Sequence, residues 1–380
     1  MTALPDDDEI EAEGIHALRV PAELVEHELT AKSKKRRVVE IVSSIGVVIV
    51  IFAFAIPAIV GSDYAAIFDE FRQLSVGQVS ELFAIWCVIM VIYTGVLTAS
   101  LPGLKRTQAL TVNLGGSAVS NVVPFGGAAG VGATYAMTMS WGFDASAVTL
   151  SILVSGIWNV FAKLGIPILA LAILAAAGES TAKLVVPTAI GVVVLVGGLI
   201  LFFLIVRSEA LAERIGKAAE RIATRVLGWI RRPPATGIPD KVLDFRHRSI
   251  GLIRARWKAL TIWMVLFNFG QFVLLLTCVR VLGASTDELG WVKVFAAFAF
   301  ANLLTTIAIT PSGVGFVEAG TVAALIAFGG DAASSAAAVF LFRGFTYLLE
   351  IPLGALGWAV WAGRHTWRKP VGSIDSRALY

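Results

Sequence analysis

The sequence predicts an all-α fold: a polytopic membrane helix bundle of about eight spans with two inverted repeats that contain broken or re-entrant helices. Composition indicates the membrane, because 57% of the 380 residues are apolar and 15% are charged, whereas soluble domains carry about 25% charged residues. An internal match indicates the repeats. Residues 124–145 align without a gap with residues 311–332, and seven of these 22 positions are identical at a constant offset of 187.

The expected spans follow the apolar runs, because a membrane helix needs about 20 mainly apolar residues. Residues 1–37 form a polar tail whose acidic stretch, Asp6 to Glu9, is not typical of a signal peptide. We therefore expect the first run to remain in the mature protein. The long runs lie near 38–61, 80–101, 146–177, 184–206, 259–282, 290–310 and 335–362, with shorter ones at 107–122, 125–140 and 313–329.

Lysine and arginine residues give the expected orientation. They cluster before the first span, after the second, throughout 207–258 and after the last span, and such clusters stay on the cytoplasmic side of a membrane. We therefore expect a multi-pass protein of the cell membrane with both termini in the cytoplasm. Its parts are the tail 1–37, the transmembrane domain 38–362 and the tail 363–380.

The repeats are expected to be inverted relative to each other. Repeat 1, about 80–177, would begin outside the cell, and repeat 2, about 259–362, would begin inside. Each contains an apolar segment interrupted by proline and glycine, which either crosses twice or turns back as a re-entrant hairpin. Paired broken helices in inverted repeats mark the binding site of many transporters. The residues at the breaks are Asn121, Pro124 and Gly126 in repeat 1 and Pro311, Gly313 and Gly315 in repeat 2.

The glycines at the breaks have an expected backbone role. At Gly126 and Gly313 we expect a positive φ or a close approach to the opposing hairpin tip, which only glycine tolerates freely. A bulkier side chain at either position should therefore abolish transport more readily than it reduces membrane insertion.

The segment 207–258 between the repeats is expected to be partly amphipathic. Within 207–232, apolar residues recur at helical spacing, and Arg214, Lys217 and Arg221 occupy the opposite face. This pattern suits a helix that lies on an anionic lipid surface. A solvated connector beneath the spans is the alternative.

Ionisable residues within the spans form the candidate site, because charge in the hydrocarbon region is costly and usually faces the bundle interior or a wet cavity. Arg343, Tyr347 and Glu350 share one helical stripe of the last span, and Asn159 and Lys163 share a similar stripe of the matching span. At the offset of 187, Lys163 falls opposite Glu350. We expect these two to form an ion pair and Arg343 to keep an unneutralised charge for an anionic ligand. A purely structural role is the alternative.

Two further polar residues flank the breaks. Glu318 follows the second break, where it is either a site residue or an ordinary acid at the start of a helix. Asn121 precedes the first break, where its amide either satisfies backbone groups freed by the interruption or belongs to the site.

Several of these residues resemble the motifs of a known family. The stretch from Pro311 to Glu318, PSGVGFVE, is similar to the Pro-Gly-Gly-x-Gly-x-x-Glu signature of flippase-like integral membrane proteins related to the N-terminal transmembrane part of lysylphosphatidylglycerol synthase. The segment from Arg343 to Thr346 resembles the Arg-x-x-Thr segment of that family's last span. Asn121 with the residues after it resembles its Asn-x-x-Pro-Gly motif. The resemblance covers roughly residues 40–362.

The resemblance implies a protein that moves an amphiphilic phospholipid or glycolipid between leaflets. Its substrate would be an anionic or phosphate-bearing membrane lipid, and a lipid-modifying enzyme would be a partner. Fused relatives also carry a soluble aminoacyl-transferase domain. Because the chain ends about 18 residues after the last expected span, we do not expect it to perform that synthesis alone.

The sequence also bears on other classes of function. The sequence has no Walker A motif, so we expect passive exchange, or coupling to ions or protons with Glu318 and Glu350 as proton carriers, in place of ATP-driven transport. All four histidines lie outside the expected spans. We therefore expect no catalytic residue, metal site or cofactor, and no nucleic-acid partner. A secondary transporter of a small solute and a membrane scaffold of an envelope-lipid synthesis complex remain as alternatives.

Overall fold

The computed structural model describes residues 64–122, 126–178, 209–229, 237–284, 289–305 and 314–374, together with a few positions between 193 and 204. All of them belong to one compact unit, Ile51–Tyr380. The apolar run expected at 38–61 and most of the run at 184–206 lie outside these described residues. Everything that follows concerns the described part of this unit.

The described secondary structure is helical, which confirms the all-α part of the predicted fold class. Besides the helices, the structure has one isolated bridge between Trp141 and Lys369. The helices are α5 (Tyr64–Arg72), α6 (Val76–Ser100), α7 (Arg106–Val122), α8 (Gly126–Ser140), α9 (Ala145–Ala176), α11 (Glu209–Trp229), α12 (Ile238–Val281), α13 (Trp291–Leu304), α14 (Phe316–Ala327), α15 (Ala332–Arg343), the π-helix η3 (Gly344–Leu348), α16 (Glu350–Gly363) and the 3₁₀ turn η4 (His365–Trp367).

Four helical segments are long and apolar enough to cross a membrane: α6, α9, the 249–281 part of α12, and the continuous α15–η3–α16 unit. The remaining apolar helices are shorter. For example, α13 has 14 residues and α14 has 12, which at 1.5 Å per residue reach about 21 and 18 Å. α12 begins at Ile238, so part of the expected linker 207–258 is continuous with the span that follows it.

The helices that follow the two matching segments also correspond in position. α9 covers 145–176 and the α15–α16 unit covers 332–363, so both ends coincide at the offset of 187. Asp144 caps the first helix by accepting the backbone N–H of Ala147, and Asp331 caps the second by accepting that of Ser334. Such caps satisfy backbone donors that have no partner within the helix.

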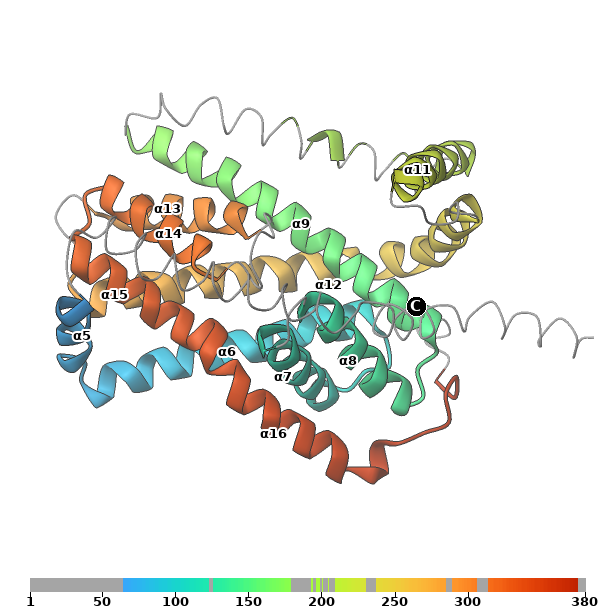
Figure 1. Ribbon diagram of the computed structural model, residues 1–380, viewed down its shortest axis with the longest axis horizontal. Helices are drawn as coiled ribbons and strands as arrows, with labels where there is room; N and C mark the ends of the chain where they lie inside the picture. Colours follow the sequence, from blue (N-terminus) through green and yellow to red (C-terminus); the bar gives the residue numbers. More distant parts are fainter. Residues whose placement is uncertain are drawn as a thin grey trace, which may run out of the picture. The chain divides into compact units, whose positions relative to one another are not determined.

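The corresponding helices of the two segments run in opposite directions (Figure 1). α6 and α12 pack against each other, with Gly95 beneath Trp263 and Gly270 beneath Ile89. This register is antiparallel, since the residue number rises on one helix as it falls on the other. In the same view, α9 runs from right to left and α15–α16 from left to right. Small residues at the crossings allow the helices to pack closely, as is common in membranes.

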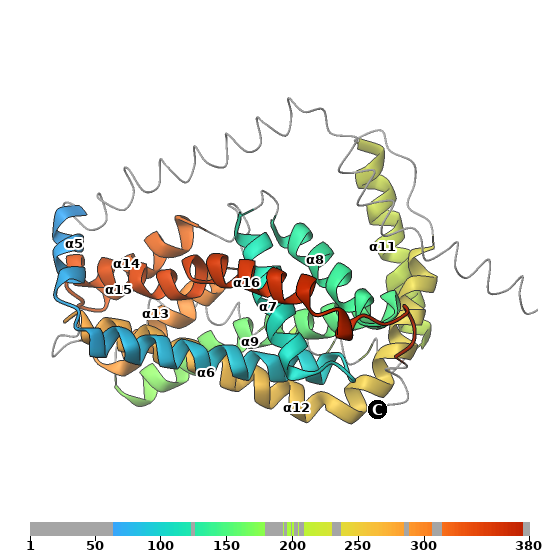
Figure 2. The same ribbon diagram turned by 90° about the horizontal axis from the view of Figure 1, so that it is seen from below.

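The first half of the molecule (α6–α9) and the second half (α12–α16) each pack one further helix against the other half. α7 of the first half packs against α16 of the second, and α13 of the second half packs against α9 of the first (Figure 2). At the first of these interfaces, the indole N–H of Trp358 donates to the carbonyl of Gly115 at 3.1 Å. Because each half packs a helix against the other, the two halves form one interlocked body. Polar side chains from both halves lie near its centre.

Hydrogen bonds join the ends of different helices at two places. At one end, the backbone N–H groups of Lys369 and Ile374 donate to the carbonyls of Ser140 and Gly142, each at 3.0 Å. The segment after α16 is thereby held against the α8–α9 turn. At the other end, the hydroxyl of Ser334 donates to the Glu70 carboxylate at 3.3 Å, which joins the start of α15 to α5.

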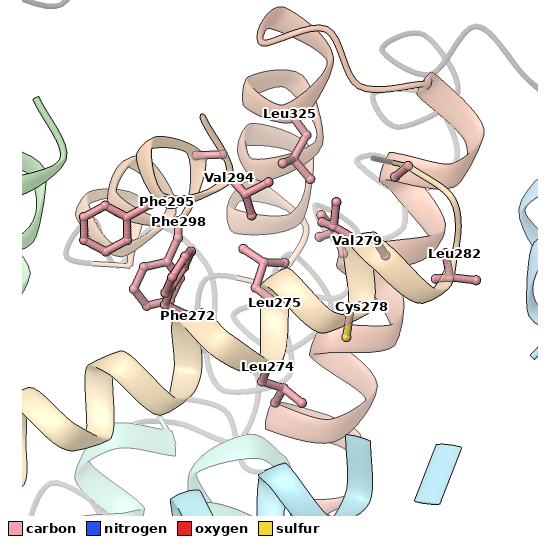
Figure 3. Close-up of a cluster of buried hydrophobic side chains, with 14 of the residues drawn as sticks. Phe272, Leu274, Leu275, Cys278, Val279, Leu282, Val294, Phe295, Phe298 and Leu325 are labelled. Atoms are coloured by element: carbon pink, nitrogen blue, oxygen red, sulfur yellow. The ribbon is translucent and has the colours of Figure 1, made fainter. Parts of the chain in front are cut away.

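The largest hydrophobic cluster packs α12 against α13, α14 and α15. Phe272 of α12 contacts the rings of Phe295 and Phe298, with ring centroids 4.9 and 6.0 Å apart (Figure 3). Leu275 and Leu325 are fully buried nearby. Dense packing of this kind transmits strain and leaves few voids, so this region supports one wall of the cavity described next.

Candidate functional site: a polar cavity between the two halves

A cavity of about 320 Å³ lies where the two halves meet. Apolar side chains such as Met90, Phe298 and Val339 form part of its wall, and polar side chains from both halves form the rest. The polar lining residues are Tyr93, Asn113, Ser117, Asn159, Lys163, Asn268, Gln271, Asn302, Thr305, Thr321, Arg343, Thr346 and Glu350. Four of the residues predicted from the sequence are among them: Asn159, Lys163, Arg343 and Glu350.

Arg343 is paired with a buried carboxylate. Its Nε donates to Oε1 of Glu318 at 2.6 Å, and the exposed fractions of the two side chains are 17% and 4%. The other oxygen of Glu318 accepts the backbone N–H of Gly315 at 2.7 Å, at the start of α14. Glu318 is therefore both the helix-start acid and the partner of Arg343. The prediction that Arg343 keeps an unneutralised charge is wrong, because this carboxylate lies beside it.

A π-helical turn separates Arg343 from Glu350. The turn covers Gly344–Leu348, and the N–H of Leu349 donates to the carbonyl of Gly344 at 2.8 Å. A π turn adds a residue to the helical repeat and often occurs at functional sites. It also changes the predicted stripe, since Arg343 and Glu350 line the cavity while Tyr347 does not.

Tyr347 connects the π turn to the end of α7. Its hydroxyl donates to the carbonyl of Asn121 at 2.7 Å, and the Asn121 amide donates to the carbonyl of Tyr347 at 3.2 Å. The Arg343 guanidinium lies 5.1 Å from the centroid of the Tyr347 ring, within the range of a cation–π contact. Tyr347 thus holds Arg343 and the first hairpin together, and its position does not suit direct contact with a ligand in the cavity.

Side chains from the first half of the chain contact the Glu350 carboxylate. The Asn121 amide donates to Glu350 Oε2 at 3.5 Å, and Ser117 faces the same carboxylate. Among the described residues, Asn121 therefore donates to a backbone carbonyl of the last span, not to one at its own break, and it also contacts a cavity residue.

Lys163 enters the same cavity from α9. Among the described residues it makes no hydrogen bond and no ion pair. The predicted ion pair between Lys163 and Glu350 is therefore absent: the offset correctly brings both residues to one cavity, but their charged groups do not meet. The ammonium of Lys163 remains available to an anion in the cavity.

The structure describes only part of the hairpin breaks. Pro124, Pro311 and Gly313 lie outside the described residues. Gly126 begins α8 against the backbone of Ser120, where a β-carbon would overlap the carbonyl. Gly315 has a φ of +85°, which L-residues with side chains rarely adopt. Gly126 thus has a close approach, but to α7 of its own hairpin and not to the opposing hairpin tip, and the expectation for Gly313 lies outside the described residues.

Two further hollows adjoin the cavity. An apolar groove of about 510 Å³ between α9, α12 and α13 shares Asn268 and Phe298 with it. A polar passage of about 270 Å³ beside α7 and α8 shares Tyr93, Asn113 and Ser117 with it. Sequence reasoning did not select Asn268 or Gln271 as site residues, although amides within the apolar 249–281 segment were a usable signal.

The fold and the cavity define the class of protein: a helical membrane protein with a polar site enclosed by its spans. Within the described ranges, no group of three or more His, Cys, Asp or Glu side chains could hold a metal ion. Residues 41–354 match the family model described as the lysylphosphatidylglycerol synthase TM region, so the chain belongs to this family. The resemblance seen in the sequence motifs is thereby confirmed. A search of curated proteins gave no match.

Proposed function

We propose that this protein moves an amphiphilic phospholipid or glycolipid between the two leaflets of the cell membrane. One observation carries the proposal: a polar cavity lies within the apolar spans, contains a lysine that has no partner among the described residues, and adjoins an apolar groove. A lipid has the same two parts, a polar headgroup joined to apolar chains. Membership of a family named for a lipid synthase supports a lipid-related role.

The physical requirement for translocation is a replacement for water. A headgroup that crosses the hydrocarbon core without hydrogen-bond partners loses several kcal/mol or more. Lys163 offers a positive charge, and the amides of Asn159, Asn268 and Gln271 offer donors and acceptors. The acyl chains would stay in the groove lined by residues such as Phe161 and Leu169, and in the bilayer next to it.

We also propose the inverted-repeat topology of about eight spans that the sequence suggests. The antiparallel register of α6 and α12 and the reciprocal packing of α7 with α16 and α13 with α9 support it. In this arrangement the two hairpins approach the midplane from opposite sides, and rocking of one half against the other exposes the cavity alternately. Both termini would lie in the cytoplasm.

The amphipathic helix α11 fits a peripheral position in this topology. It packs against the start of α12, where the backbone N–H of Ile238 donates to the Glu220 carboxylate at 3.2 Å. Lys217, Arg221 and Arg225 line a shallow surface hollow on it. We propose that this basic face contacts anionic lipid headgroups, and that a lipid-modifying enzyme is a partner of the protein.

A secondary transporter of a small solute is the second candidate, since a volume of about 320 Å³ lies within the range of small-molecule sites. The two are separated by one experiment in proteoliposomes. Leaflet exchange of fluorescent phospholipids is measured by quenching of the outer leaflet, beside uptake of soluble anions and amino acids. Lipid exchange without solute uptake supports the proposal, and solute uptake without lipid exchange contradicts it. A membrane scaffold would show neither activity.

A further inference from the structure

The polar passage beside α7 and α8 differs in chemistry from the cavity it joins. It has a volume of about 270 Å³ and is lined from α6, α7, α8 and α9. Tyr93, Asn113 and Ser117 line both hollows, so the two adjoin. Whereas Lys163, Arg343 and Glu350 bring charge to the cavity, none of the described residues that line the passage is charged.

Several polar groups of the passage can accept hydrogen bonds from a ligand. The hydroxyl of Thr134 donates to the carbonyl of Gly130 at 3.0 Å, and that of Ser155 donates to the carbonyl of Ile152 at 3.2 Å. Because each hydroxyl has a single proton and two lone pairs, both oxygens keep acceptor capacity for a ligand. The amide nitrogen of Asn113 points to the sulfur of Met90 at 3.6 Å, which leaves the amide oxygen of Asn113 as a further acceptor.

Three described residues of the second half differ in chemistry from the passage residues that they match. At the offset of 187, Ser155 corresponds to Phe342, Ser117 to Leu304, and Gly130 to Val317. Leu304 and Val317 are buried apolar residues. At these three positions the small or polar lining of the passage is therefore particular to the first half.

We infer that this passage holds the uncharged, hydroxyl-bearing part of a lipid headgroup, a glycerol or a sugar, while the lipid phosphate lies near Lys163. The inference rests on the proposed function and specifies its substrate class. Hydroxyl groups can donate to the acceptors of the passage. A charged headgroup end would lose its hydration there without meeting an opposite charge, which is costly.

Four fluorescent phospholipids test this in proteoliposomes of the full chain. Phosphatidylglycerol and phosphatidylinositol carry a glycerol and a cyclic polyol beyond the phosphate, phosphatidylethanolamine carries an ammonium group, and phosphatidylserine keeps a net negative charge with charged groups at its end. The wild-type protein is expected to exchange the two polyol lipids at least about tenfold faster than the other two. The ratio between the first two lipids distinguishes a glycerol from a sugar-sized headgroup.

Two substitutions at Ser155 test whether the preference for polyol lipids depends on the passage. Ser155→Phe introduces the residue found at the matching position of the second half and fills the passage, so the preference for polyol lipids should fall to near unity. Ser155→Ala removes one acceptor without adding volume and should reduce the preference by only a few-fold. Leu153→Phe is the matched control, because Leu153 lies on the same helix and is 44% exposed, away from the passage. It should keep the wild-type preference.

The outcomes separate the inference from the function on which it rests. Equal exchange of all four lipids, or a preference that survives Ser155→Phe, overturns the passage as a headgroup site while lipid translocation stands. If the wild-type protein exchanges none of the four, lipid translocation fails, and the passage assignment fails with it.

Discussion

The two halves of the molecule share a backbone plan but differ in where they carry charge. α9 is one uninterrupted helix, whereas the segment that matches it contains the π turn at Gly344–Leu348. The second half has Arg343 and Glu318 where the first half has Gly156 and Val131. The two halves therefore have corresponding helices, whereas the charged side chains of Arg343 and Glu318 have no counterpart at the matching positions of the first half.

The two halves also contribute different polar groups to the walls of the cavity. The second half contributes an ion pair that is satisfied within the protein, between Arg343 and Glu318. The first half contributes Lys163, which has no partner among the described residues, and the uncharged passage. Substitutions in the second half should thus affect folding first, and substitutions in the first half should affect transport first.

The largest expected effect comes from separating the buried ion pair. Glu318→Ala leaves the Arg343 guanidinium beside an apolar gap, and removing one partner of a buried pair typically costs about 3–5 kcal/mol. The free energy of unfolding in detergent, from thermal or denaturant unfolding, measures the change. Glu213→Ala, which breaks the exposed pair of Glu213 with Lys217, is the control and should cost at most about 1 kcal/mol. Equal losses in the two variants would contradict the structural role assigned to the second half.

A smaller effect is expected at the start of α8. Gly126→Ala places a methyl group against the backbone carbonyl of Ser120, and overpacking of this kind costs about 1–3 kcal/mol. Gly127→Ala is the matched control, because no atom lies within 4 Å of a β-carbon there. Its replacement should be neutral or slightly stabilising, since alanine favours helices. If both variants unfold at the wild-type midpoint, α7 and α8 do not pack as closely as described.

The smallest effect concerns the cap of α15 and depends on pH. The backbone N–H of Ser334 lowers the pKa of Asp331 below its ordinary value of 3.8. Because the folded-state pKa is the lower one, the carboxylate stabilises the fold above pH about 4, and this contribution is lost as pH falls through the lowered pKa. Asp331→Ala should therefore cost about 1 kcal/mol at pH 7 and less near pH 3. Unfolding midpoints of both proteins at these two pH values provide the measurement, and a pH-independent difference would contradict the role of charge at this cap.

The helix bounds were largely predictable from the sequence. The apolar run at 146–177 became α9 at 145–176, because the length of an uncharged apolar run limits where a membrane helix can begin and end. The sequence analysis did not predict the caps, although Asp144 and Asp331 precede the two matching helices and each accepts a backbone N–H.

The partner of Arg343 was not predictable from the repeat. Symmetry placed Lys163 and Glu350 at one cavity, but it gives the positions of backbones around an axis and not the reach of side chains. Glu318 lies on a different helix and corresponds to Val131 in the first half, so the offset contained no signal for its pair with Arg343. The π turn was equally hidden, because it depends on contacts between Tyr347 and Asn121 that are 226 residues apart.

The decisive measurement is the rate of leaflet exchange of phosphatidylglycerol in proteoliposomes that contain Lys163→Met. Methionine keeps much of the length of lysine and removes the charge, and since Lys163 has no partner among the described residues, the unfolding midpoint should stay near that of the wild type. Exchange should fall about tenfold or more, which corresponds to about 1.4 kcal/mol of lost phosphate interaction. Lys105→Met, at an exposed position outside the cavity, should exchange lipid at the wild-type rate. Unchanged exchange by a folded Lys163→Met protein would contradict the assignment of the cavity as the headgroup site.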